Sequence, residues 1–157
     1  MSAETALPSL DFLAAECSQK ISAAIDPTDG NKKAQDMENL ITKALGVLQE
    51  QGVYALFLFL LSRCGSGDEG ENDEKRAAAV LVSELLVMLG KEPLGALQIG
   101  YLDKLDSASV SKQKTKILSH VADHIVRKND TLFLVRDLFE QALIYARYTA
   151  KASKKGR

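Results

Sequence analysis

Apolar residues recur at three- and four-residue spacing along most of the chain, the period that places them on one face of an α-helix. The pattern predicts a first helix from about Leu10 that ends before the turn-rich residues 26–30, and a second helix from about Lys33 to Gln51. Gly52 interrupts the second helix. Residues 53–63 carry apolar side chains on every face, so we expect this third helix to be the central, enclosed one.

The rest of the chain also has the helical period. Residues 64–72 (CGSGDEGEN) combine glycine with acidic side chains and predict a flexible acidic loop. Four helices are then predicted, over Glu74–Leu89, Leu94–Leu105, Ser109–Arg127 and from after Asp130-Thr131 to about Lys151. Because period-two alternation is missing, a sheet is not expected. The prediction is an all-α fold, a compact bundle of about six helices in a single domain, with residues 1–8 and 152–157 flexible.

Length and composition agree with a soluble globular protein. The chain has 157 residues, of which 46% are hydrophobic and 26% charged. The longest apolar run covers residues 53–61, whereas a membrane-spanning helix needs about 20 residues, and the N-terminus has no basic leader. Two distant cysteines, Cys17 and Cys64, are too few for a disulfide framework or a zinc site. We therefore expect a cytoplasmic protein with reduced thiols.

Charge is unevenly divided along the sequence. Residues 1–100 contain 8 basic and 15 acidic side chains, whereas residues 101–157 contain 12 basic and 6 acidic ones. The overall net charge of −1 therefore conceals a polarised chain. This asymmetry favours a basic surface that meets an anionic partner.

Two predicted helices carry the basic side chains. In the first, Lys112, Lys116, His120 and Arg127 fall on the side opposite Leu118, Val121 and Ile125. In the closing helix, Arg147 and Lys151 line one face together with Lys154 and Lys155, beside Tyr145 and Tyr148. Basic residues interleaved with aromatic ones suit a nucleic-acid backbone, and the alternative is a solvated face that complements the helix dipole.

Catalytic and metal-binding patterns are weak. The chain has no phosphate-binding glycine loop, and the cysteines lack an obvious activating neighbour. His120 and His124 share a helix face at a spacing that can hold zinc, but Val121 stands where the metalloprotease motif has glutamate, and a third ligand is not apparent. We predict no metal, no cofactor and no catalytic residue.

Two segments carry a resemblance to a known family. They are residues 48–60 (LQEQGVYALFLFL) and residues 140–152 (EQALIYARYTAKA). The first resembles the small helical subunit of Cmr-type (type III-B) CRISPR effector complexes, in which a polar residue and glycine precede an apolar helix with alanine, leucine and phenylalanine. The second is similar to the closing helix of that family, in which glutamate and an alanine-leucine pair precede a basic residue and repeated alanine. Residues 110–128 look like an extra helix relative to this pattern.

The resemblance implies a non-catalytic structural subunit that stacks in the minor filament of the complex. Its partners would be the other effector subunits, copies of itself, guide RNA and target RNA. We do not expect it to bind a membrane. The residues implied or expected to contact RNA phosphates are Arg147 and Lys151, then Lys112, Lys116 and Arg127, and from other helices Lys20, Lys43 and Arg63. Two alternatives stay open: a stand-alone helical protein-interaction adaptor without RNA binding, and a small all-α enzyme such as a metal-dependent hydrolase.

Overall fold

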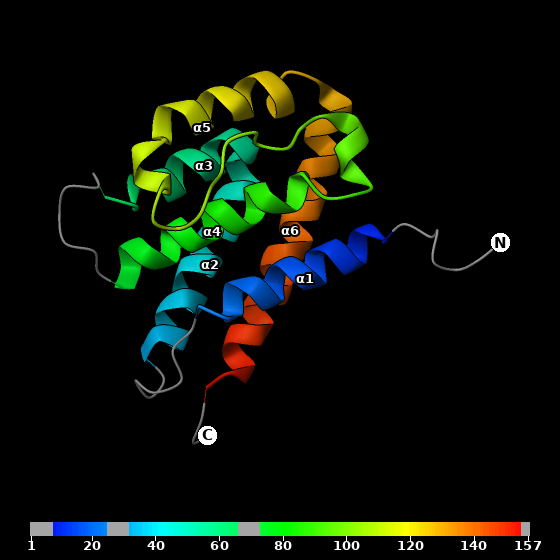
Figure 1. The fold of residues 1–157 in the computed structure, drawn as a ribbon. Coiled ribbons are helices and arrows are strands. Elements are labelled where there is room, and N and C mark those ends of the chain that lie inside the picture. The colour runs from blue at the N-terminus through cyan, green and yellow to red at the C-terminus, as the bar shows by residue number, and fades with distance from the viewer. Residues whose placement is uncertain (1–7, 25–31, 66–72, 155–157) are drawn as a thin grey trace.

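A computed structural model describes residues 8–24, 32–65 and 73–154 of the chain (Figure 1). Within these ranges the structure has six α-helices and no strand: α1 (Leu10–Ser22), α2 (Lys32–Gln51), α3 (Val53–Ser62), α4 (Asp73–Leu89), α5 (Lys114–Val121) and α6 (Asn129–Ala152). The prediction of an all-α bundle of about six helices is confirmed. Residues 66–72 of the predicted acidic loop, and residues 1–7 and 155–157 of the predicted flexible ends, lie outside the described ranges.

The helices pack around a single apolar cluster. α6 lies against α1 and α2 and runs antiparallel to α2 (Figure 1). Two contacts show this direction: Arg136 near the start of α6 donates to the Gln49 carbonyl near the end of α2, and Lys154 just beyond the end of α6 pairs with Glu38 in the first half of α2. α4 contacts α1, α2 and α3. None of the helices in the described residues is long and apolar enough to cross a membrane.

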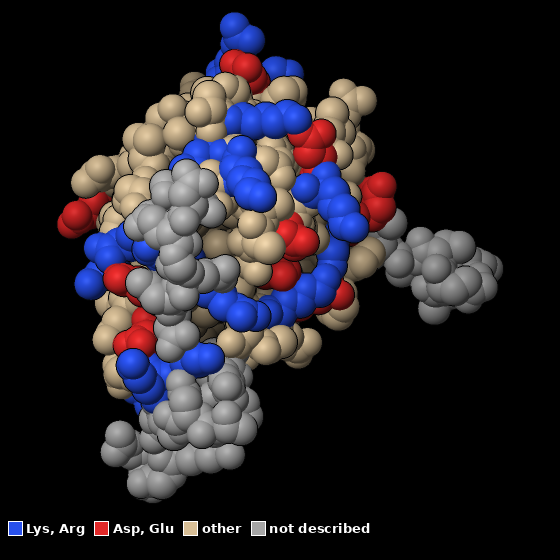
Figure 2. All heavy atoms as spheres, turned by 60° about the vertical axis from the view of Figure 1, so that its left-hand side comes forward, with Lys and Arg blue, Asp and Glu red and all other residues tan. Residues whose placement is uncertain are grey.

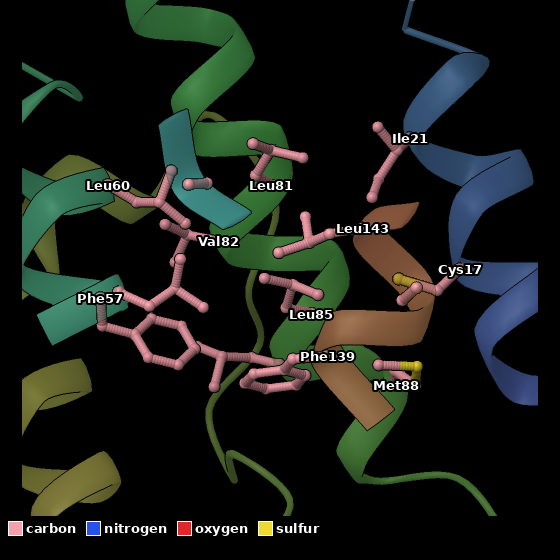
Figure 3. Packing of buried hydrophobic residues seen from close by; sticks show 14 of the residues in the cluster. Cys17, Ile21, Phe57, Leu60, Leu81, Val82, Leu85, Met88, Phe139 and Leu143 are labelled. Atoms are coloured by element: carbon pink, nitrogen blue, oxygen red, sulfur yellow. The ribbon is translucent and has the colours of Figure 1, made fainter. Parts of the chain in front are cut away.

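The most enclosed helix is α4. Its residues from Ala77 to Ser83 are buried without interruption, and Leu85, Leu86, Met88 and Leu89 are buried as well. Figure 3 shows Leu81, Val82, Leu85 and Met88 of α4 among side chains from α1, α3 and α6. Small side chains at positions 77–79 let neighbouring helices approach closely, and the larger ones fill the space between them.

The prediction that residues 53–63 form the central helix is wrong. α3 buries Leu56, Phe57 and Leu60, but Tyr54 and Leu58 are 36% and 46% exposed on its outer side. The apolar composition of the segment identified an apolar helix, but it did not reveal that only one side of the helix meets the core. The outer side of α3 is therefore an apolar surface.

The chain between α4 and α6 is less regular than predicted. Instead of a helix over residues 94–105, only Leu94–Leu97 form a short 3₁₀ turn (η3). This turn ends because Gln98 adopts a left-handed conformation with φ of 56°, and Gly100 packs its backbone against Gly90. A Cβ atom at Gly100 would lie 2.8 Å from the Gly90 Cα, so this approach requires glycine.

The predicted helix over residues 109–127 is divided into three parts. A 3₁₀ turn, η4 (Val110–Lys112), comes first, then α5, and then a π-helical turn, η5 (Ala122–Val126). Gln113 separates η4 from α5, because its φ of −121° and ψ of 19° are not helical. Side chains on the two sides of Gln113 therefore do not follow the 100° spacing of one continuous helix.

The last helix begins earlier than predicted. α6 starts at Asn129 after the N-cap residue Lys128, so Asp130 and Thr131 lie inside its first turn instead of capping it. The Lys128 side chain provides no capping hydrogen bond, but the Lys128 carbonyl accepts from the Leu132 amide at 2.9 Å. The capping residues predicted from the sequence lie two and three residues after the observed N-cap.

We expect Phe139→Ala to destabilise the bundle by about 3–5 kcal/mol, because the Phe139 ring is fully buried and would leave a cavity. Its ring also makes an edge-to-face contact with Phe57, with centroids 5.8 Å apart (Figure 3). Chemical denaturation measures the change in the free energy of unfolding. Phe133→Ala is the matched control on the same helix, since Phe133 is 61% exposed and should change stability by less than about 0.5 kcal/mol. Equal losses of stability in both variants would contradict this packing.

Candidate nucleic-acid interface

Three lysines line one shallow hollow at the start of α5. Lys112, Lys114 and Lys116 surround it together with Asp103, Ser111, Gln113 and Thr115, and we call it the basic hollow. Lys116 forms an ion pair with Asp103, and both side chains are largely exposed. Lys112 is exposed, and no ion pair of Lys112 occurs within the described part of the chain. The hollow thus presents positive charge to solvent, only partly offset by one carboxylate.

Sequence reasoning identified Lys112 and Lys116 but missed Lys114. In one continuous helix, residues two positions apart point in nearly opposite directions, which removes Lys114 from the face of the other two. The non-helical Gln113 breaks that relation between Lys112 and Lys114, and all three lysines line the same hollow. The alternation of lysine at positions 112, 114 and 116, which has no helical explanation, was the available signal.

The basic hollow lies next to the C-terminal end of α3. The Lys114 ammonium donates a hydrogen bond to the Gly65 carbonyl, which ties the start of α5 to the residues that follow α3. Arg63 at the same end of α3 lies over the Phe59 ring at 4.7 Å and pairs with Glu74 at 3.0 Å. Figure 2 turns the left-hand side of Figure 1 toward the viewer and shows many Lys and Arg side chains on that face. Arg63 thus lies two residues before the Gly65 carbonyl that holds Lys114, a link that the sequence could not have predicted.

Arg147 and Lys151 form a separate group at the other end of the molecule. Both lie near Glu38, a largely buried carboxylate of α2, whose Oε2 is 3.9 Å from the Lys151 ammonium. Lys154, which is only 15% exposed, lies closer, with its ammonium 2.6 Å from Glu38 Oε1. The Lys154 ammonium holds the pKa of Glu38 below its ordinary value against the opposing effect of burial, and Lys151 and Arg147 act in the same direction. Part of the positive charge at this end is therefore balanced inside the protein.

The remaining candidate residues are dispersed. Lys20 of α1 lies beside Lys91, whose ammonium lowers the pKa of Lys20, while Glu16 pairs with Lys91 at 2.9 Å. Lys43 is exposed on α2, and Arg127 is exposed at the end of η5. The eight predicted positions thus do not form one continuous surface, and of them only Lys112 and Lys116 line the basic hollow.

The two histidines line a cleft together with Tyr101 and Leu102, next to Asp103 of the basic hollow. The His120 Nε2 is 2.8 Å from the Ile99 carbonyl oxygen, which fixes the proton on Nε2 in the neutral ring. The His124 ring stacks on His120 with centroids 4.6 Å apart and an interplanar angle of 20°. Lone pairs of nearly parallel rings do not converge on one point, so this geometry does not form a two-histidine metal site. Among the described residues, no three His, Cys, Asp or Glu side chains come together as metal ligands.

Both cysteines are free and buried within the apolar cluster. Burial raises the pKa of the Cys17 thiol to about 12 and that of Cys64 to about 11. Lys20 and Lys91 lie near Cys17 and favour its thiolate, but their effect is smaller than that of burial. Neither thiol is therefore ionised near neutral pH, and nucleophilic chemistry at these positions is disfavoured.

Comparison with protein-family models, with curated proteins and with solved structures gives no match to this chain.

We expect the bundle to lose stability as the pH falls from about 7.5 to about 5.5. Burial lowers the pKa of His120 below its ordinary value of 6.5, so the unfolded chain binds more protons in this window than the folded chain. Thermal melting across the pH range measures the effect, which should be smaller in His120→Gln, a variant with an amide that can still donate to the Ile99 carbonyl. The pKa values of Glu16 and Glu38 are also lowered, but these two groups reduce stability mainly as the pH falls below their ordinary pKa of 4.5, which is outside the measured window. An identical decline in His120→Gln would show that another group is responsible.

Proposed function

We propose that this protein is a non-catalytic helical RNA-binding subunit of a ribonucleoprotein, in the manner of the small subunit of type III-B CRISPR effector complexes. The observation that carries RNA binding is the basic hollow, which Lys112, Lys114 and Lys116 line together. Phosphate oxygens bind to clustered ammonium and guanidinium groups without a base-specific geometry. One lysine of the hollow, Lys114, is fixed in place by the Gly65 carbonyl, so the surface is held by the fold.

The apolar outer side of α3 supports a role in an assembly. Tyr54 and Leu58 are one helical turn apart and exposed, and they belong to the segment 48–60 that resembles the CRISPR subunit. Exposed apolar side chains that lie together are typical of surfaces that another protein covers. A subunit that stacks on copies of itself or on neighbouring subunits would use such a surface.

A stand-alone adaptor without RNA binding is the second candidate, and the same exposed Tyr54 and Leu58 favour it. The two functions differ in what the protein carries when it is isolated from cells. Co-purification with other effector subunits and guide RNA would support the ribonucleoprotein subunit, whereas co-purification with protein alone, together with no binding to RNA in vitro, would support the adaptor.

Replacing Lys112 and Lys116 together with alanine should weaken binding of the full chain to single-stranded RNA of unrelated sequences. Phosphate binding carries no base information, and each phosphate that the variant no longer neutralises should reduce the slope of log affinity against log salt by about 0.7. A salt titration of RNA binding measures the slope. Lys32→Ala with Lys128→Ala is the charge-matched control, because both residues are exposed and neither lines the basic hollow. An unchanged affinity and slope in the Lys112/Lys116 variant would contradict the proposal.

Replacing Arg147 and Lys151 together with alanine should have a smaller effect on RNA binding than the Lys112/Lys116 pair. Glu38 already offsets part of their charge, and removing them leaves Lys154 to pair with Glu38. The same salt titration compares the two double variants at equal change in net charge. A larger loss of affinity at Arg147 and Lys151 would place the main RNA contact at the end of α6, where the family resemblance puts it.

A further inference from the structure

A cleft of about 600 Å³ opens where the segment after α4 meets α5 and η5. Eight residues line it: Gly90, Gly95, Gln98, Gly100, Tyr101, Leu102, His120 and His124. None of these lining residues is Asp, Glu, Lys or Arg, so the described wall of the cleft carries no carboxylate, ammonium or guanidinium group. A cleft of this volume fits a group the size of one or two planar rings.

The cleft lies where the backbone is unusual at three places. Gly100 packs directly against Gly90, where a Cβ atom at Gly100 would lie 2.8 Å from the Gly90 Cα. Gln98 adopts the left-handed conformation, and η5 inserts a π-helical turn that contains His124. Left-handed residues and π-helical turns are both enriched at binding sites because they displace side chains from regular positions. Several irregular features thus meet at one cleft, which favours a functional role for it.

The wall of the cleft offers flat ring surfaces. Tyr101 meets His120 edge to face, with centroids 5.4 Å apart, and His124 stacks on His120 with an exposed ring. Leu102 at the cleft is 95% exposed, so an apolar surface lies beside the rings. Because Nε2 of His120 donates to the Ile99 carbonyl, Nδ1 is left as a hydrogen-bond acceptor. Stacking faces combined with a few polar groups are what an unpaired nucleobase requires.

The cleft and the basic hollow are neighbours. Leu102 lines the cleft and the next residue, Asp103, lines the hollow. Tyr101 of the cleft donates a hydrogen bond to Gln113 of the hollow, with the two oxygens 2.6 Å apart. One nucleotide can therefore place its base in the cleft while its phosphates face the basic hollow on the other side of this hydrogen bond.

We propose that this cleft binds one unpaired nucleobase of single-stranded RNA by stacking against His124. The inference rests on the proposed RNA-binding function and adds a base contact to the phosphate contacts of the basic hollow. Such stacking is tolerant of sequence, since every base has a flat face. The protein would then distinguish single-stranded RNA from a continuous duplex, in which bases are not free to enter the cleft.

The test compares RNA with and without bases. A single-stranded RNA of about ten nucleotides is prepared both intact and with abasic positions throughout. We expect the full chain to bind the intact RNA about tenfold more tightly than the abasic one, and we expect His124→Ala to remove this difference. Intact RNA with one 2-aminopurine should be quenched on binding to the wild-type protein and not to His124→Ala. Ser119→Ala, an exposed position on α5 outside the cleft, is the matched control and should behave as wild type.

Each outcome separates the base contact from the phosphate contacts. Equal binding of intact and abasic RNA by the wild-type protein would overturn the nucleobase site while leaving the basic hollow as an RNA contact. A loss of affinity in His124→Ala that is the same for both RNAs would also overturn it, because His124 would then contact the backbone. Failure of both RNAs to bind would reject the proposed function itself. His124→Ala should retain the wild-type melting temperature, since its ring is exposed.

Discussion

Helix α4 must bury apolar side chains on almost every side, and this requirement determines where its neighbours lie. Residues 77–83 are buried without a break, which requires α1, α2 and α3 to surround the helix and leaves α6 to close the bundle against α1 and α2. A helix enclosed in this way leaves little room for a binding site, because close-packed interiors resist deformation. The candidate sites accordingly lie outside this core, on the chain that leaves α4 at Gly90.

Residues 90–127 carry most of the features that bear on function. The contact between Gly90 and Gly100 turns the chain back across the end of α4, and the buried side chains of Ile99, Val110 and Ile117 anchor it to the core. The backbone between Gly90 and Gln113 is mostly irregular, and together with α5 and η5 it forms both the basic hollow and the histidine cleft. In a regular helix over the same residues, Lys114 would point away from the face that Lys112 and Lys116 share. The break at Gln113 removes this helical relation between Lys112 and Lys114.

The basic side chains at the two ends of the molecule differ in how closely a carboxylate neutralises them. At the end of α6, Lys154 and Lys151 share the Glu38 carboxylate, so those cations contribute to holding α2 and α6 together. In the basic hollow, the Lys116–Asp103 pair is exposed to water, where an ion pair is weak and easily exchanged for another anion. A phosphate can displace an exposed carboxylate more readily than a largely buried one. This difference favours the hollow over the end of α6 as the site of the proposed RNA contact.

Local spacing, glycine positions and simple charge were enough to predict the helical class, the bounds of α2 and α3 to within a residue, and the basic character of the C-terminal third. The sequence could not determine which helix is enclosed: residues 53–63 and 74–89 are both strongly apolar, and only packing showed that α3 keeps Tyr54 and Leu58 in solvent. Nor could it place Lys114 with Lys112 or join Tyr101 to Gln113, since those contacts depend on a break in helical geometry that tertiary packing imposes. The side chains of the candidate sites were visible in the sequence, but their grouping was decided by the turn at Gly90 and Gly100, where two backbones approach more closely than any side chain would allow.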